Sequence, residues 1–435
     1  MKRSLVILFF SLSLFMSLPI CYGQKVLSLE QAKILTLENN FGIRISKNNV
    51  ELAENLTDKK ANGYRPTVSA TGVLDGGYGS SSQKFSTGLD ASTDQALSWN
   101  GTASVRADYT IFDKGRALTL DQLKESLELS NLQLNQAVQQ NLLNVYQAYY
   151  QLAIDIENVE ALEETIGVST ERLRRVEYQL EFGQGAGLDV LNAEVDIKRD
   201  SVNLLNARLN VENSKRDLNI AMGSYYNEDF TIEAITDVDE SLNLETLLSE
   251  ARQNNIDLQI NRQNQSVNEI DLDIINAEMR PTLSANASYD YNYANNAPGS
   301  FVITSSSQGF SGALTLAWNF YDASRDIRKQ NTVLNLDNIR LETERIEQEL
   351  ERNIVNAWAN YQNAKYVLQV ERSAVSTNEE NFSITEELLK IGRLTSIEFR
   401  QAQLNLLNAQ TSLNNALLNV KVAEIQLLSL VGDLL

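Results

Sequence analysis

The sequence contains no histidine, one cysteine and only four prolines among its 435 residues. Without histidine, and with Cys21 as the single thiol, the chain lacks the residues for Ser–His–Asp or Cys–His catalysis, for most zinc sites and for an internal disulfide. We therefore expect no enzyme, no cofactor and no metal site. No proline stands between Pro66 and Pro281, so nothing in that stretch forbids very long helices.

Positive charge is also scarce, because 37 basic residues face 57 acidic ones and give a net charge of −20. Such a balance argues against a nucleic-acid partner. Apolar residues make up 43% of the chain, which excludes general disorder. Charged residues make up 22% and the mean hydropathy is −0.27, which excludes a polytopic helical membrane protein.

The N-terminus has the pattern of a secretory leader. Lys2 and Arg3 precede an apolar run over residues 5–18, and small residues follow up to Gly23. We predict a signal peptide over 1–23, because the run is shorter than the ~20 residues that a spanning helix needs. A membrane anchor and lipidation of Cys21 are the alternatives. No later apolar stretch is long enough to span a membrane as a helix.

The rest of the sequence contains an internal duplication. The two copies share short segments at constant offsets: Leu27-Ser28-Leu29-Glu30 with Leu242-Asn243-Leu244-Glu245, Arg65-Pro66-Thr67 with Arg280-Pro281-Thr282, Phe112-Asp113 with Tyr321-Asp322, and Gly223 with Gly432. We predict a first repeat over 24–222, an equatorial linker over 223–242 and a second repeat over 243–435. Each repeat should contain a helix, a β-hairpin, a very long helix, a tip turn and a final helix.

Four segments alternate apolar and polar residues and so predict half-buried strands. They cover 103–111, 282–293, 310–320 and, more weakly, 67–74. Gly/Ser-rich stretches at 76–82 and 295–307 should join them as loops. Each run has about 10 residues, the length of a tilted strand that crosses a bilayer.

Long helices should follow the strands. Residues 116–182 contain no proline, and a helix of that length extends ~100 Å. Apolar residues recur at alternating steps of three and four, as in a coiled-coil seam; in the second copy they are Leu350, Ile354, Ala357, Tyr361, Ala364 and Leu368. Helices over 29–62 and 188–222 are about half as long, so two of them stacked end to end would match one long helix.

Four strands with one apolar face are too few to form a closed barrel in a bilayer. An open sheet leaves the backbone N–H and C=O groups of its edge strands without partners, and single-chain barrels begin at about 8 strands. A shared barrel would have 8 strands in a dimer or 12 in a trimer. The aromatic residues near the helix-side ends of the strands fit a membrane girdle: Tyr109, Phe112, Trp318, Phe320 and Tyr321. The alternative is a soluble β-layer with ordinary core aromatics.

The duplicated pattern resembles the outer membrane efflux protein family, the TolC-like export ducts. The resemblance covers essentially the whole mature chain and is carried also by the two tip segments over 182–193 and 391–399, where an apolar residue and glycine precede the next helix. It implies an α+β membrane protein with four strands per chain, a homotrimer with one twelve-stranded transmembrane β-barrel, and a periplasmic α-helical coiled-coil tunnel.

The resemblance also implies partners: outer-membrane lipid, a periplasmic adaptor protein and an inner-membrane transporter that supplies the energy. The duct itself would passively export drugs, metal ions or unfolded proteins, in a tripartite efflux or type I secretion system. The alternative is a trimeric periplasmic structural or adhesin-like coiled-coil protein that conducts nothing.

In the family, tip residues close the tunnel and contact the adaptor. The matching positions here are Gly183, Asp189, Gly392, Arg393, Glu398 and Gln401. Arg393 lies one position before the usual gating arginine, and Gln401 stands where some members carry a constricting aspartate. The competing interpretation is that Asp189 and Glu398 only cap helices, Glu398 through a capping box that starts at Thr395.

Overall fold

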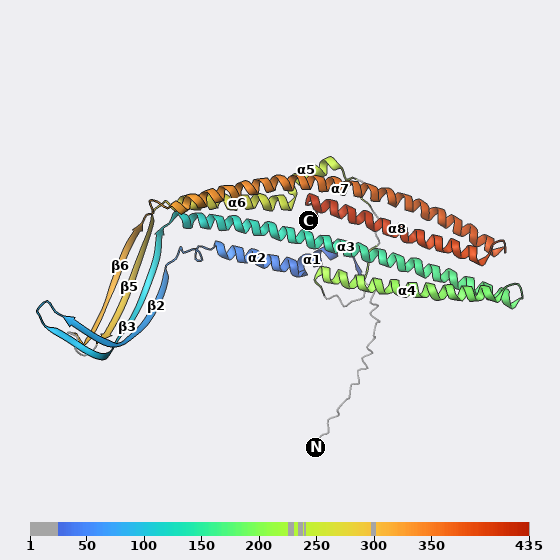
Figure 1. The fold of residues 1–435 in the computed structure, drawn as a ribbon. Coiled ribbons are helices and arrows are strands. Elements are labelled where there is room, and N and C mark those ends of the chain that lie inside the picture. The colour runs from blue at the N-terminus through green and yellow to red at the C-terminus, as the bar shows by residue number, and fades with distance from the viewer. Residues whose placement is uncertain (1–24, 225–229, 234–237, 239–240, 297–301, 435) are drawn as a thin grey trace, which may run out of the picture.

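The computed structural model describes residues 25–224, 230–233, 238, 241–296 and 302–434, so the expected leader at 1–23, with Cys21, lies outside the described residues. The molecule is elongated, with a four-stranded sheet at one end and long helices that run side by side away from it (Figure 1). Within the described residues, no helix combines the length and the apolar character needed to cross a membrane.

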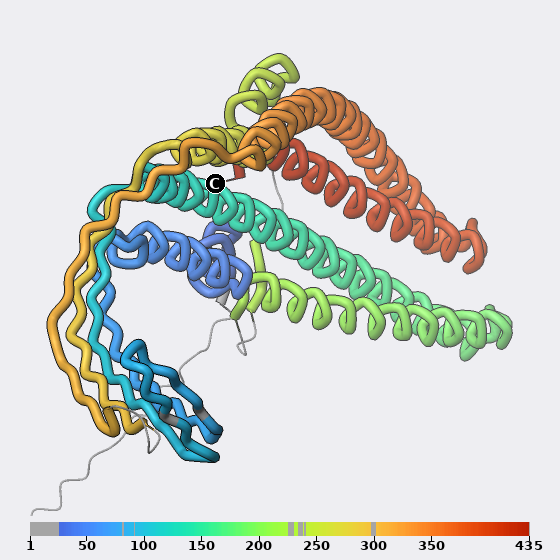
Figure 2. The backbone as a smooth tube through the Cα atoms, turned by 60° about the vertical axis from the view of Figure 1, so that its left-hand side comes forward, coloured from blue at the N-terminus to red at the C-terminus, as the bar shows by residue number. Residues whose placement is uncertain are grey.

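The sheet is antiparallel and contains β2 (Thr67–Lys84), β3 (Asp90–Phe112), β5 (Thr282–Asn295) and β6 (Thr304–Ala317), in the order β2-β3-β5-β6. Its register aligns apolar residues with apolar residues: Ala70 lies opposite Val105, Val105 opposite Tyr289, and Tyr289 opposite Phe310. The predicted alternation therefore produces one apolar face that continues across all four strands. Figure 2 shows that the sheet is strongly curved.

Several predicted strand and loop bounds were wrong. The strand expected over 103–111 begins at Asp90, and the last residues of the loop expected over 295–307 belong to β6, which begins at Thr304. The glycine- and serine-rich stretch 76–82, expected as a loop, belongs to β2, because backbone pairing with β3 needs no large side chains. The alternation over 310–320 continues beyond the end of the strand, since β6 ends at Ala317. Trp318 and Phe320 instead lie in the connection to the next helix, which begins after its N-cap Asp322.

Two groups of helices have matching lengths. The first contains α1 (Leu29–Asn39), α2 (Phe41–Thr57), α3 (Lys114–Glu181) and α4 (Gly187–Met222). The second contains α5 (Leu244–Asn254), α6 (Ile256–Ala277), α7 (Ala323–Lys390) and α8 (Ser396–Val431). Both α3 and α7 have 68 residues, and both α4 and α8 have 36, so the long helices and the half-length helices after the tip turns were predicted correctly.

The single helix predicted over 29–62 is instead two helices separated by Asn40. The side chain of Asn40 accepts a hydrogen bond from the Ile43 N–H (3.2 Å) and donates one to the Ala221 carbonyl (2.7 Å), so it caps α2 and the end of α4 together. Asn255 makes the equivalent bonds between α6 and α8. Gly223 has φ 68°, and a Cβ there would lie 2.6 Å from the Asn39 carbonyl oxygen. The helices α2 and α4 thus meet end to end beside α3, and α6 and α8 meet in the same way beside α7.

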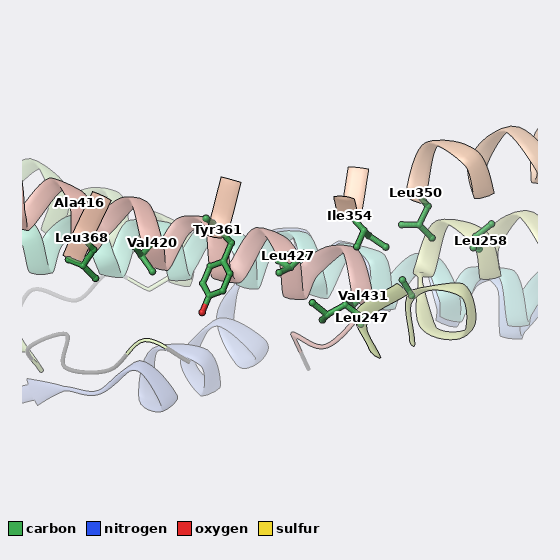
Figure 3. Close-up of a cluster of buried hydrophobic side chains, with 12 residues drawn as sticks. Leu247, Leu258, Leu350, Ile354, Tyr361, Leu368, Ala416, Val420, Leu427 and Val431 are labelled. Carbon is green, nitrogen blue, oxygen red and sulfur yellow. The ribbon is translucent and has the colours of Figure 1, made fainter. Parts of the chain in front are cut away.

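The long helices are joined by apolar seams. All six residues of the predicted α7 seam belong to one core cluster, and Figure 3 shows Tyr361 and Leu368 of α7 facing Val420 and Ala416 of α8. Near the middle of the rods, β1 (Lys25–Leu27) pairs in parallel with β4 (Phe230–Ile232). The Tyr149 hydroxyl of α3 donates to the Leu27 carbonyl (2.9 Å), which fixes this small sheet against the rod.

Candidate functional site at the free ends of the helices

Each long helix ends in a glycine turn that returns the chain into a half-length helix. Gly183 after α3 has φ 69° and Gly392 after α7 has φ 71°, so both adopt the left-handed conformation that closes a helix C-terminus. A Cβ at either position would meet no atom within 4 Å. The backbone angle, and not a lack of space, therefore explains glycine at these two positions.

Glu398 belongs to a complete capping box at the second turn. The Thr395 N–H and hydroxyl both donate to Glu398 Oε2, at 2.9 and 2.7 Å, and the Glu398 N–H donates to Thr395 Oγ1 at 3.3 Å. The hydrogen bond from the Thr395 hydroxyl, followed by that from its N–H, lowers the pKa of Glu398. The predicted capping box is confirmed.

Asp189 lies in the equivalent first turn of α4 without such a box. The N-cap of α4 is Ala186, which has no side-chain oxygen, and no hydrogen bond or ion pair of the Asp189 carboxylate is found among the described residues. The helix macrodipole is the local interaction that favours a carboxylate at this position. Asp189 is thus a partly exposed acid that no capping bond engages.

The remaining predicted tip residues are exposed. Arg393 lies in the turn before α8, where its N–H donates to the Leu388 carbonyl (2.9 Å). Gln401 donates to Asn405 one helical turn further along α8 (2.8 Å). Within one chain, the described structure shows no hydrogen bond or ion pair between the side chains of the six predicted tip residues, so their gating and adaptor roles remain predictions.

The predicted aromatic girdle lies at the opposite end of the rods. Tyr109 and Phe112 are in the last residues of β3, while the other three follow β6: Trp318, Phe320 and Tyr321. All five are exposed, and Trp318 stacks on Phe320 with ring centroids 4.7 Å apart. The Trp318 indole N–H donates to the Met279 carbonyl (3.0 Å), which holds the ring at the junction between sheet and rods.

A buried polar cluster, which the sequence analysis missed, links the two helix pairs a few turns above the tips. Arg400 of α8 donates to both oxygens of Asp200 on α4, at 2.8 and 2.5 Å, and to Ser169 of α3 at 3.2 Å. Asp200 is 1% exposed and Arg400 6%. The bidentate pair therefore spans helices from both halves of the chain with almost no contact with solvent.

Further contacts complete this cluster. Gln403 of α8 donates to the Thr165 carbonyl (2.8 Å) and to the Ser169 hydroxyl (3.0 Å) on α3. Arg172 of α3, also buried, donates to Asp196 of α4 at 2.5 Å. Removing one partner of a buried ion pair costs about 3–5 kcal/mol, because the other charge is left desolvated.

A sequence signal for this cluster exists in the seam of α4. The apolar positions Ala193, Ile197 and Leu204 leave Asp200 at a place where the three-four spacing calls for an apolar residue. A charged residue in a coiled-coil seam requires a buried partner. The spacing alone does not say that the partner is Arg400, which lies 200 residues away.

The comparisons with known proteins agree with this architecture. The family model described as outer membrane efflux protein matches residues 35–224 and 247–433. No curated protein matches the chain. Among solved structures, the outer-membrane channel OprN is 17% identical, with a TM-score of 0.70. The match covers 93% of this chain and 89% of the OprN chain.

Two further structures have the same fold. The Campylobacter jejuni CmeC outer membrane channel is 16% identical with a TM-score of 0.71, and covers 93% of this chain and 85% of its own. The Neisseria gonorrhoeae MtrE outer membrane channel, solved in an open state, is 14% identical with a TM-score of 0.68, and covers 93% of this chain and 88% of its own.

Family and neighbours are channel proteins rather than enzymes, which agrees with the mostly helical α+β fold and the absence of histidine. They place the chain in the outer membrane, with most of its mass in the periplasmic helical part. The chain belongs to the outer membrane efflux protein family.

Proposed function

We propose that this efflux channel is a passive homotrimeric duct in which three chains share one twelve-stranded barrel and one periplasmic tunnel. An inner-membrane transporter would drive export through a periplasmic adaptor that contacts the tips, in a tripartite efflux or type I secretion system. The observation that carries the proposal is the open sheet: β2 and β6 form its two edges, and no described strand covers either edge.

An open sheet with an exposed apolar face is unstable in lipid as a single chain. Val68 of β2 and Phe310 and Leu314 of β6 are largely exposed on the apolar face, which fits contact with acyl chains. Each unsatisfied edge N–H or C=O in lipid costs several kcal/mol. Pairing β2 of one chain with β6 of the next removes both edges, and a head-to-tail contact of this kind closes into a ring.

The helices have unpaired edges on the same two sides. Across the rods, α4 packs on α3, α3 on α8, and α8 on α7, so α4 and α7 are the outer helices. Besides the seam facing α3, α4 has a second apolar row that is exposed: Leu188, Leu191, Val195, Val202, Leu205 and Leu209. On the tip-side half of α7, at the same height as α4, the exposed apolar residues include Val355, Tyr366, Val370 and Ile384. Two exposed apolar surfaces at opposite edges fit a contact between neighbouring copies.

The matching helix lengths support internal duplication with the repeat bounds predicted from sequence, 24–222 and 243–435, around the linker at 223–242. The proposed barrel then receives one hairpin from each repeat. Both tips would lie at the same end of the tunnel, because α3 and α7 have equal lengths and start at the same edge of the sheet.

The tips carry a surface that fits a protein partner. Large apolar side chains flank both turns and are largely exposed: Phe182, Leu188, Ile391 and Ile397. Exposed apolar groups gathered at the end of a rod are typical of a protein–protein contact. We infer that the adaptor docks here, with Gly183 and Gly392 fixing the shape of the turns it contacts.

Planar-bilayer conductance combined with mass measurement in detergent tests the duct. We expect stable channel events from a particle of about three times the mass of the processed chain, which is slightly below the 48.7 kDa of the full sequence. A trimer that never conducts, even after Asp189→Ala and Glu398→Ala, would favour the non-conducting structural or adhesin-like role. A monomer that is soluble without detergent would contradict the shared barrel itself.

A further inference from the structure

One repeated motif is explained neither by the barrel nor by the tunnel and its tips. Arg65-Pro66-Thr67 and Arg280-Pro281-Thr282 stand where the rods give way to the sheet, with β2 beginning at Thr67 and β5 at Thr282. Proline explains the corner, because it cannot continue a helix and it holds the preceding residue extended. It does not explain the arginine, whose side chain is exposed at both corners.

The other two strands lead into exposed cations at the same edge. Lys114 opens α3 directly after β3, and Lys329 lies within two turns of the start of α7 after β6. At this end of the sheet Phe112 pairs with Leu283 and Thr282 with Ala317, while Thr67, the first residue of β2, pairs with Asp108. The four cations therefore all lie near the end of the sheet where its strands, ~4.8 Å apart, join the rods. We call Arg65, Lys114, Arg280 and Lys329 the junction collar.

The carboxylates near the collar already have other partners: Asp113, beside Lys114, caps α3 by accepting a hydrogen bond from the Arg116 N–H (3.1 Å), and the others have cationic partners. Lys60 pairs with Asp58 (3.7 Å) and Arg325 with Asp326 (3.0 Å), while Arg328 binds both Glu278 and Asp322. No ion pair of a collar residue is found among the residues that the structure describes. The collar therefore presents unneutralised positive charge in a chain whose net charge is −20.

Aromatic residues place the collar at the membrane surface. Trp318 is bonded to the Met279 carbonyl, next to Arg280, and Phe320 and Tyr321 are exposed beside it in the chain. Tryptophan and tyrosine concentrate at the level of lipid headgroups. Cations at that level lie close to the phosphates of the leaflet.

We propose that the junction collar binds the phosphate groups of anionic glycerophospholipids at the periplasmic surface of the outer membrane. This inference rests on the proposed shared barrel. The collar lets a strongly acidic rod approach an anionic surface, because it supplies the attraction at the one level where rod and headgroups meet. Each Lys or Arg near such a surface favours anionic lipid by about fivefold.

Quenching of tryptophan fluorescence by brominated lipids tests the collar, since bromine quenches an indole that the acyl chain touches. The chain has three tryptophans, so Trp99→Phe with Trp358→Phe leaves Trp318 as the reporter at the collar. Trp318→Phe with Trp358→Phe leaves Trp99, which pairs with Asn295 at the far end of the shared sheet. The full-length protein is placed in vesicles with brominated phosphatidylglycerol or brominated phosphatidylcholine.

We expect Trp318 to favour phosphatidylglycerol over phosphatidylcholine by at least about fivefold, and Trp99 to show no preference. Replacing the four collar residues by glutamine should bring the preference at Trp318 to about one. The matched control replaces four exposed cations of the rods by glutamine and should keep the preference: Arg174, Lys198, Arg352 and Arg372.

Quenching at both reporters without a phosphatidylglycerol preference at Trp318 would overturn the collar and leave the barrel intact. A preference that survives the four collar substitutions would overturn the collar as well. Absence of quenching at both reporters by either lipid would instead contradict the shared barrel on which the collar rests.

Discussion

The two tips are equivalent in sequence position and different in structure. The second tip starts α8 with the Thr395–Glu398 capping box, whereas the first starts α4 at Ala186 without a side-chain cap and has glycine at 183, 185 and 187. Glu398 is therefore occupied by a local structural bond, while Asp189 is not. Two acids that match one family position need not have one role, and Asp189 is the better candidate for a contact beyond its own helix.

Above the tips the difference disappears, because one buried cluster holds both helix pairs together. Arg400 on α8 forms an ion pair with Asp200 on α4. If one tip moves relative to the other, either this ion pair breaks or both helices move together. The tips thus combine unequal local caps with a common long-range bond.

Arg400→Met should have the largest effect. It leaves Asp200 buried with Ser169 as its remaining donor and should destabilise the region by about 3–5 kcal/mol. Hydrogen exchange should show loss of protection over residues 165–172 and 396–404. The exposed Arg199, which pairs with Asp196 at 3.0 Å, is the matched control, and Arg199→Met should cost less than about 1 kcal/mol. Equal effects of the two substitutions would refute the cluster as the common bond.

Substituting the N-cap residue should destabilise the helix start at the second tip and stabilise it at the first. Thr395→Ala removes the capping box and should destabilise the start of α8 by about 1 kcal/mol. Ala186→Ser adds a cap at a position whose backbone is already extended (φ −97°, ψ 139°) and should stabilise the start of α4 by a similar amount. Exchange rates of the first-turn amides in each helix measure both. If Ala186→Ser leaves the first tip unchanged, the glycines and not the missing cap distinguish the tips.

Acid should loosen the second tip. The pKa of Glu398 is lowered from its ordinary value of 4.5 by the Thr395 hydrogen bonds, so the folded-state pKa is below the unfolded one. Its contribution is therefore complete above pH 4.5 and is lost as pH falls through the lowered pKa. Protection factors over 396–399 should drop in that range, and Glu398→Gln, which cannot titrate, should remove the dependence. A drop that persists in Glu398→Gln would assign the effect to another group.

Asp189→Asn should have the smallest effect on stability and a visible effect on conduction. With no capping bond to lose, the change in unfolding free energy should remain within about 0.5 kcal/mol. If Asp189 helps to close the tunnel, single-channel conductance should rise, or cells should become more sensitive to bulky antibiotics. Unchanged conductance and sensitivity would leave the macrodipole as the reason for this acid.

Much of the candidate site was predictable because it depends on local patterns. The glycine turns, the capping box and the α7 seam each involve residues within a few positions of one another along the chain. The gating roles of Arg393, Glu398 and Gln401 remain predictions, since within the described part of one chain their side chains form no hydrogen bond or ion pair with another predicted tip residue. The Arg400–Asp200 pair was missed because spacing shows that a seam position is polar but does not identify its partner.

The sequence by itself determined the periodic elements: helix lengths set by the distribution of proline and glycine, seams set by three-four spacing, and an apolar sheet face set by alternation. Only the tertiary structure decided where Asn40 divides a helix, how far β2 and β3 extend, and which charges are buried together. Local hydrogen bonds and side-chain periodicity are encoded in neighbouring residues. Long-range partners are chosen by packing, which brings together residues that no local pattern relates.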